Sequence, residues 1–343
     1  MTRRNALTLG LTGLVSATAW ARQTEKTPKN KRILASDGQM YQLGATEQVS
    51  APGTSVLGVA PKGRYLLSVY DKRATPAPRR KGAYIPPLRI LSLWDTKLRR
   101  AKTLWRYQET AESQIYTPHL RAWLSPTVAL LEYDYATHAT ESVMLVVNCG
   151  TGTVSTVPLL SGYQTLHVNI NPTQPSVFVC RVSEAESEQK KEILLIGASG
   201  LMKQRVISGG VSLIGWSRDG KRFYASRSEK TQSGDGYRER WFTLDSNLQE
   251  TPLQNAPNDI AVFAAREPEP ELSLQCIERT ATLTVDSVKE SLSSLWLSTS
   301  EEGAEIRVAA EIDADSGILM PDLSAVAYQY QRALYVTPLT KLE

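Results

Sequence analysis

The stretch Leu213-Ile-Gly-Trp-Ser-Arg-Asp-Gly-Lys-Arg-Phe-Tyr-Ala-Ser226 decides the fold of this chain. Two short apolar segments flank a turn that contains Asp219 and Gly220, and turn residues of this kind bring one β-strand back antiparallel to another. Weaker copies occupy residues 57–69, 121–133, 167–179 and 318–330, and we expect an eroded copy over 260–277. Self-similarity of this size indicates a repeat architecture.

Each copy is followed by a second pair of apolar segments around a polar turn. The copies follow one another at intervals of 46 to 63 residues, and a four-stranded propeller blade takes roughly 40 to 50 residues. These second hairpins are expected over 89–104, 143–157, 193–207, 241–253 and 295–309.

The last unit is one strand short at the C-terminus. Residues 333–338 supply its third strand, and we expect 39–43 to come from the N-terminus as the fourth. This pairing would close a ring and cover the strand edges that an open sheet exposes. We therefore predict an all-β fold, a β-propeller of six four-stranded blades closed by an N-terminal strand.

The turn phrase also carries a family resemblance. Trp216-Ser-Arg-Asp-Gly-Lys221, followed by an apolar strand, resembles the repeat phrase of TolB-like, WD40-like propellers, and Pro321-Asp322 before Ala325-Val-Ala-Tyr328 is similar. Arg218 replaces the usual proline and the fifth copy lacks the turn residues, so five or seven blades stay open as alternatives. A β-sandwich is the competing all-β architecture. The resemblance implies a propeller that binds a protein or peptide.

The N-terminus has the features of an export signal. Arg3-Arg4 precede a mild apolar run over 6–19 and an Ala-x-Ala site, which predicts a twin-arginine-like signal peptide over 1–21. An uncleaved anchor is the alternative, although the run is short and polar for a span. We expect a disordered leader over 22–32 and a single propeller domain over 33–343, in the periplasm or secreted from a bacterium, with no stable membrane insertion after cleavage.

Charge and cysteine usage exclude several classes of partner. The net charge is +4, of which the two N-terminal arginines supply half, and nucleic-acid binding needs clustered basic residues that are not compensated. Cys149, Cys180 and Cys276 fall in separate apolar segments without metal-ligand spacing, which favours buried thiols over a disulfide. We expect no cofactor, no metal, no nucleic-acid partner and a monomer.

The candidate catalytic residues fall in one cluster near the expected channel. His119 and His167 fall in or just before first strands of neighbouring units, which line the channel of a propeller. With Arg121 and Asn169 they could form a polar patch at the channel mouth. Glu132 and Asp134 look like solvated residues at a strand end, and no nucleophile elbow occurs. We expect no catalytic residues.

Long connections between second and third strands are the best candidates for binding, because loops on a rigid scaffold usually carry it. The first connection, 71–88, contains several prolines together with Arg79, Arg80 and Tyr84, which suit an anchoring role. We therefore expect an exported, non-catalytic propeller that binds a protein or peptide partner through its loop-rich face. The alternatives are a channel-mouth lyase or hydrolase acting on a carbohydrate through His119, Arg121 and His167, and a degenerate propeller with a structural role.

Overall fold

The computed structural model describes residues 31–342 except 36–37, 73–74, 77–83, 86–87, 109–117, 135–141, 184–189, 208–209, 231–235, 262–271, 286–287, 300–304 and 314–315. The residues of the expected signal peptide and most of the leader lie outside this range, while Arg32, expected in the leader, begins the first strand. The described secondary structure consists of β-strands alone.

Four sheets contain four antiparallel strands each, and their order in the sheet follows the chain. The first comprises β4 (Thr54–Val59), β5 (Tyr65–Lys72), β8 (Leu88–Asp95) and β9 (Arg100–Gln108). The second comprises β10 (His119–Ser125), β11 (Val128–Asp134), β12 (Ser142–Asn148) and β13 (Thr153–Val157). The third comprises β14 (Tyr163–Ile170), β15 (Ser176–Ser183), β16 (Lys191–Gly197) and β17 (Gly200–Ile207). The fourth comprises β18 (Val211–Trp216), β19 (Phe223–Lys230), β20 (Tyr237–Leu244) and β21 (Glu250–Pro252).

Two further sheets differ from this pattern. The fifth has three strands, β22 (Leu272–Val285), β23 (Val288–Thr299) and β24 (Glu305–Asp313). The sixth joins β25 (Ile318–Leu319), β26 (Ala325–Tyr330) and β27 (Ala333–Leu342) to the N-terminal strands β1 (Arg32–Leu34), β2 (Met40–Leu43) and β3 (Glu47–Gln48). A small ribbon of β6 (Thr75–Pro76) and β7 (Tyr84–Ile85) lies in the connection between β5 and β8.

The sequence predicted most of these strands. Every hairpin expected from the repeated turn phrase is present except the eroded fifth copy, and the second hairpins are present as well. The predicted N-terminal strand also pairs antiparallel with the last strand, Met40 opposite Leu342. In the fifth copy, Ile260 forms an isolated bridge with Ser217, and residues 262–271 lie outside the described part of the chain. Residues 272–277, the second half of this copy, form the start of β22.

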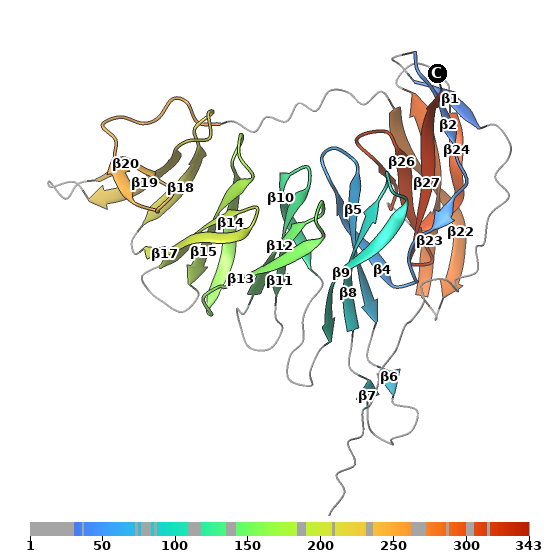
Figure 1. Ribbon diagram of the computed structural model, residues 1–343, viewed down its shortest axis with the longest axis horizontal. Helices are drawn as coiled ribbons and strands as arrows, with labels where there is room; N and C mark the ends of the chain where they lie inside the picture. The colour runs from blue at the N-terminus through green and yellow to red at the C-terminus, as the bar shows by residue number, and fades with distance from the viewer. Residues whose placement is uncertain are drawn as a thin grey trace, which may run out of the picture.

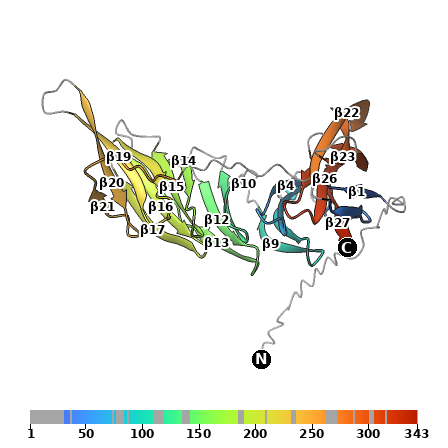
Figure 2. The same cartoon turned by 90° about the horizontal axis from the view of Figure 1, so that it is seen from above.

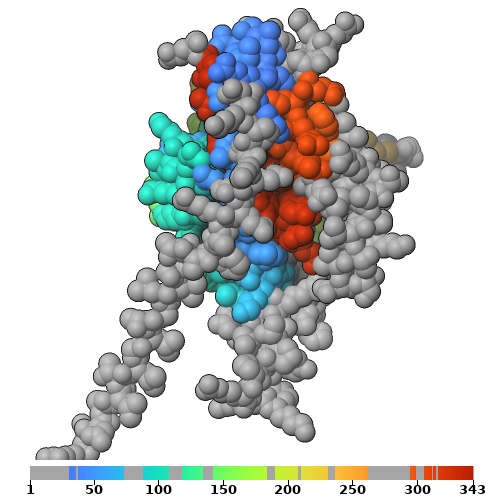
Figure 3. Space-filling view, turned by 90° about the vertical axis from the view of Figure 1, so that its right-hand side faces the viewer, coloured from blue at the N-terminus to red at the C-terminus, as the bar shows by residue number. Residues whose placement is uncertain are grey.

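The six sheets stand in a row (Figure 1), from β18–β21 at one end to β22–β24 at the other. First strands such as β4, β10 and β14 lie along one side of the row and last strands such as β9, β13 and β17 along the other (Figure 2). Sheets of this kind packed face to face are how propeller blades are built. In Figure 3 the N-terminal strands lie beside the fifth sheet at one end.

Five hydrophobic cores hold the row together, and each one is shared by two neighbouring sheets. Leu67 and Leu91 of the first sheet pack with Leu131 and Leu145 of the second, for example. Alternation along each strand sends successive apolar side chains to opposite faces, so one strand contributes to two cores. Among the described residues, none of these cores joins the fourth sheet to the fifth, and these two sheets are the ends of the row.

Candidate functional site

A strained turn organises the candidate site. Gln331 and Arg332 connect β26 to β27, and both have left-handed backbones, with φ of 49° and 59°. Non-glycine residues rarely adopt this conformation, which costs free energy and tends to occur at functional sites. The Asp313 carboxylate stabilises the turn because it accepts both backbone N–H groups, at 2.9 Å from Gln331 and 2.8 Å from Arg332.

The first sheet holds the same turn from the other side. The Arg332 carbonyl accepts the backbone N–H groups of Gly53, at 2.8 Å, and Thr54, at 3.0 Å. Gly53 has φ of 92°, and a Cβ atom there would lie 3.3 Å from the carbonyl oxygen of Asp71. Glycine is therefore required where the two sheets meet, because any other residue would be strained and crowded.

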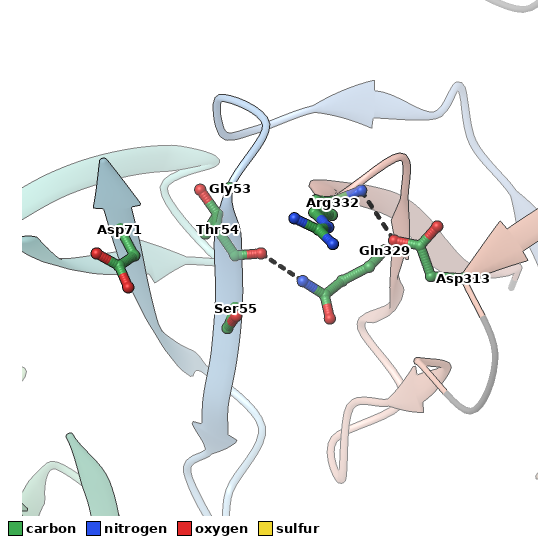
Figure 4. A pocket seen from close by; sticks show the side chains of 7 residues that line it. All are labelled: Gly53, Thr54, Ser55, Asp71, Asp313, Gln329 and Arg332. Atoms are coloured by element: carbon green, nitrogen blue, oxygen red, sulfur yellow. Dashed lines mark hydrogen bonds between the residues drawn. The ribbon is translucent and has the colours of Figure 1, made fainter. Parts of the chain in front are cut away.

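A pocket of about 280 Å³ opens at this meeting point. Its lining comes from the N-terminal end of β4, the C-terminal end of β5, the end of β24 and the β26–β27 hairpin. The lining residues are Gly53, Thr54, Ser55, Asp71, Asp313, Gln329 and Arg332. Figure 4 shows Arg332 and Gln329 on one side of β4 and Asp71 on its other side.

Charged and amide groups dominate the pocket. Asp71 also forms an ion pair with Arg89, with 3.2 Å between its carboxylate and the guanidinium Nε. Gln329 donates a side-chain N–H to the Thr54 carbonyl, which ties the sixth sheet to the first. Two carboxylates and one guanidinium can bind and orient a polar or charged group, and the lining residues include no histidine that could activate the Ser55 hydroxyl.

The pocket lies at the base of the connection that the sequence singled out. Asp71, which lines it, is the next-to-last residue of β5, and the connection to β8 starts immediately afterwards. Tyr84 is in β7, opposite Pro76. Arg79 and Arg80 lie outside the described residues, so their anchoring role stays a prediction.

The expected channel-mouth residues lie on two neighbouring first strands. His119 begins β10 and His167 is in β14, and both are exposed. Among the described residues no hydrogen bond or ion pair joins the two histidines. The Arg121 guanidinium instead lies 2.5 Å from the Glu132 carboxylate, and the Asn169 carbonyl accepts the indole N–H of Trp216 at 3.0 Å.

One expectation about these strands was wrong. Glu132, which the sequence suggested was solvated at a strand end, is buried with 1% of its surface exposed. Its carboxylate accepts hydrogen bonds from Arg121 and from the Thr165 hydroxyl of the third sheet, the latter at 2.6 Å. The side chain is buried because it bridges two sheets, and strand alternation alone could not reveal a partner in another sheet.

A second buried charge pair escaped the sequence analysis. Arg181 and Glu192 are opposite each other on β15 and β16, and both are completely buried. Arg181 also donates to the Leu160 carbonyl at 3.0 Å and to the Ser142 hydroxyl at 2.8 Å. The signal was present as Arg181 within the apolar strand β15 and Glu192 near the start of the apolar strand β16. The pair connects the second and third sheets, so it stabilises the scaffold.

The described residues also include cysteines and possible metal ligands outside the pocket. Cys149 and Cys180 are buried free thiols, as predicted, and the prediction for Cys276 concerns a side chain outside the described part of the structure. No three or more His, Cys, Asp or Glu side chains within the described ranges are grouped so that they could hold a metal ion. None of the described elements is a helix long and apolar enough to cross a membrane.

Comparison with known proteins adds structural neighbours only. No family model matches the chain, and no curated protein matches it either. Similar solved structures include an oligogalacturonate lyase in complex with manganese, with 12% identity, 90% of this chain and 96% of that chain covered, and a TM-score of 0.31. The β-propeller domain of the Trilobed protease from Pyrococcus furiosus has 9% identity, coverage of 89% and 94%, and a TM-score of 0.31. TolB from Acinetobacter baumannii has 14% identity, coverage of 85% and 65%, and a TM-score of 0.24.

Proposed function

We propose that this protein is an exported, non-catalytic β-propeller that binds a protein or peptide partner through the face around the 71–88 connection. The observation that carries the proposal is the clamped turn at Gln331-Arg332. Two sheets hold this turn in a left-handed conformation, and it places Arg332 in a charged pocket at the base of that connection. Left-handed backbones also occur at Arg99, Leu248 and Leu323, but the Gln331-Arg332 turn combines this strain, which clusters at functional sites, with a charged pocket.

The pocket suits one charged group of a larger partner. At about 280 Å³ it is smaller than the sites of roughly 300–1,000 Å³ that hold drug-sized ligands. A carboxylate of the partner would face Arg332, and a basic group would face Asp71. The rest of the partner would lie against the 71–88 connection, where the prolines limit the entropy lost on docking.

We also propose that the six sheets are the blades of one ring. Five shared cores join them in sequence, and the β2–β27 pairing already connects the two ends of the chain. Ring closure requires the fourth and fifth sheets to pack together. Small-angle X-ray scattering tests this, because a closed ring has a clearly smaller maximum dimension than the row in Figure 1.

Partner capture tests the binding proposal. The tagged full-length protein is expressed in its own host and cross-linked to its partners. The same is done with two variants. One is Arg332→Gly, and in the other a short Gly-Ser linker replaces 73–87. Glycine accepts the left-handed backbone at 332, so this change removes the guanidinium and keeps the turn. Gln331→Gly is the matched control, because it relaxes the same turn and leaves Arg332 in place.

We expect one or more specific partners that the control variant retains and that both test variants lose. If the Arg332→Gly variant and the linker variant capture the same partners as the unaltered protein, this face is not the binding surface. Mass spectrometry of the mature protein tests export as well, because cleavage after Ala21 is expected.

A further inference from the structure

The first sheet differs from the others at one cross-strand position. Ser68 of β5 lies opposite Ser92 of β8, on the face that meets the sixth sheet. In the next three sheets, the corresponding positions hold large or apolar residues that fill the core with the preceding sheet. These pairs are Leu131 opposite Leu145, Val179 opposite Leu194, and Ala225 opposite Phe242.

A cavity of about 270 Å³ occupies the space that the two serines leave. Ala101 and Thr103 of β9 extend its lining with two more small side chains. Tyr70, Ile90 and Trp94 supply aromatic and aliphatic walls. The lining is therefore mainly apolar, with hydroxyl groups placed at intervals, which is the usual composition of a small-molecule site.

The sixth sheet does not fill the gap from its side. Its outer edge strand β3 has only two residues, and the chain then crosses as Val49-Ser50-Ala51 to enter β4. Leu334 of β27 lies at the inner wall. A full-length outer strand would present side chains to the first sheet, so the short edge strand and the serine pair together create the cavity.

One buried polar atom in the lining has no partner. The Trp94 side chain is buried, with 8% of the residue exposed, and its indole N–H makes no hydrogen bond to the described residues. A buried donor without a partner destabilises the folded protein. This donor is therefore unsatisfied in a residue that lines the cavity. The indole N–H of Trp216, in contrast, donates to the Asn169 carbonyl.

We propose that this cavity is a second binding site, which takes a small molecule with one aromatic ring and a carbonyl-type acceptor. The ring would pack against Tyr70 and Ile90, and the oxygen would accept the hydrogen bond that Trp94 donates. The cavity size limits the ligand to about one ring with a short substituent. This site is distinct from the charged pocket around Arg332, although Thr54 lines both.

The test uses two probes of the same shape, acetophenone and ethylbenzene, which differ only in the carbonyl acceptor. Both are titrated into full-length protein labelled with ¹⁵N in the tryptophan side chains, and the indole N–H signals are followed by NMR. A Trp94→Phe variant assigns the Trp94 signal. We expect acetophenone to shift this signal downfield and to bind at least tenfold more tightly than ethylbenzene, while the Trp216 signal stays in place.

A Ser92→Leu variant fills the cavity and should weaken acetophenone binding at least tenfold. Ser212→Leu is the matched control, because it adds the same side chain at an exposed position of β18. The inference is overturned if acetophenone leaves the Trp94 signal unmoved, if the two probes bind equally well, or if Ser92→Leu binds acetophenone as the unaltered protein does. Partner capture through Arg332 does not depend on any of these results.

Discussion

The two faces of the first sheet pack against their neighbours in different ways. Toward the second sheet, Leu67 and Leu91 meet Leu131 and Leu145 in a continuous core. Toward the sixth sheet, Leu66 and Trp94 also pack in a core, but Ser68 and Ser92 leave a cavity beside it. We call the first the filled junction and the second the hollow junction. They differ in side-chain size and in the facing sheet, because the sixth sheet departs from the four-stranded pattern and includes the two-residue strand β3.

The difference lies in the size of the side chains at one cross-strand position of the repeat. Large apolar residues at the central cross-strand position stabilise a junction by roughly 25 cal/mol for each Å² of apolar surface that they bury. Small hydroxyl residues at the same position bury less apolar surface, so they stabilise the junction less and leave a cavity. The hollow junction and the charged pocket share Thr54 in their linings, so both candidate sites lie where the last sheet meets the first.

Thiol reactivity should differ most between the two junctions. Burial in the filled junction raises the pKa of Cys149 to about 12, whereas a thiol that reaches the cavity should titrate near 8.5. In a Cys276→Ser background, we expect the Ser92→Cys thiol to react with iodoacetamide at pH 8 about 1,000-fold faster than Cys149. Mass spectrometry of labelled peptides measures both rates, and equal rates would contradict the assignment of a filled and a hollow side.

Opening the filled junction should destabilise the protein strongly. Leu131→Ser removes a fully buried side chain and places a hydroxyl in an apolar core. We expect a loss of about 3–5 kcal/mol in the free energy of unfolding, measured by urea denaturation. A loss below about 1 kcal/mol would show that this junction is not tightly packed.

The clamped turn beside the hollow junction should contribute less. Asp313→Ala removes the carboxylate that holds both N–H groups of the turn, and we expect a loss of about 1–2 kcal/mol. Adding Gln331→Gly should restore part of this loss, because glycine tolerates the left-handed backbone. If Gln331→Gly restores none of the lost free energy of unfolding, Asp313 does not act by offsetting backbone strain in the turn.

Filling the hollow junction should have the smallest effect on stability. Ser92→Leu adds apolar volume to the cavity, and we expect a gain of about 0.5–1 kcal/mol, seen as a small rise in melting temperature. The Ser212→Leu variant should show no gain. A loss of more than 1 kcal/mol in Ser92→Leu would mean that the space is already filled in the folded protein.

The sequence predicted the strands well because local patterns determine them. Turn residues such as Asp219-Gly220, with alternating apolar residues on each side, mark a hairpin without any knowledge of the rest of the chain. The same pattern located the N-terminal strand that pairs with β27. The eroded fifth copy lacks its turn residues, and there Ile260 bridges Ser217 without forming the expected strand.

The two candidate sites could not be predicted in this way. The charged pocket brings Gly53 and Asp71 together with Asp313 and Arg332, which only the pairing of sheets from opposite ends of the chain can achieve. The cavity exists because Ser68 and Ser92 occupy the cross-strand position that Leu131 and Leu145 occupy in the second sheet. The serines are visible in the sequence, but their significance follows from aligning equivalent strands after the pairing is known.

A crystal structure of the protein soaked with acetophenone would show whether the junction between the last and first sheets binds small molecules. We predict one acetophenone molecule between Ser68, Ser92 and Trp94, with its carbonyl oxygen within hydrogen-bond distance of the Trp94 indole nitrogen. A junction closed by side chains, or one that holds only water under the same conditions, would show that it is not a binding site for this ligand.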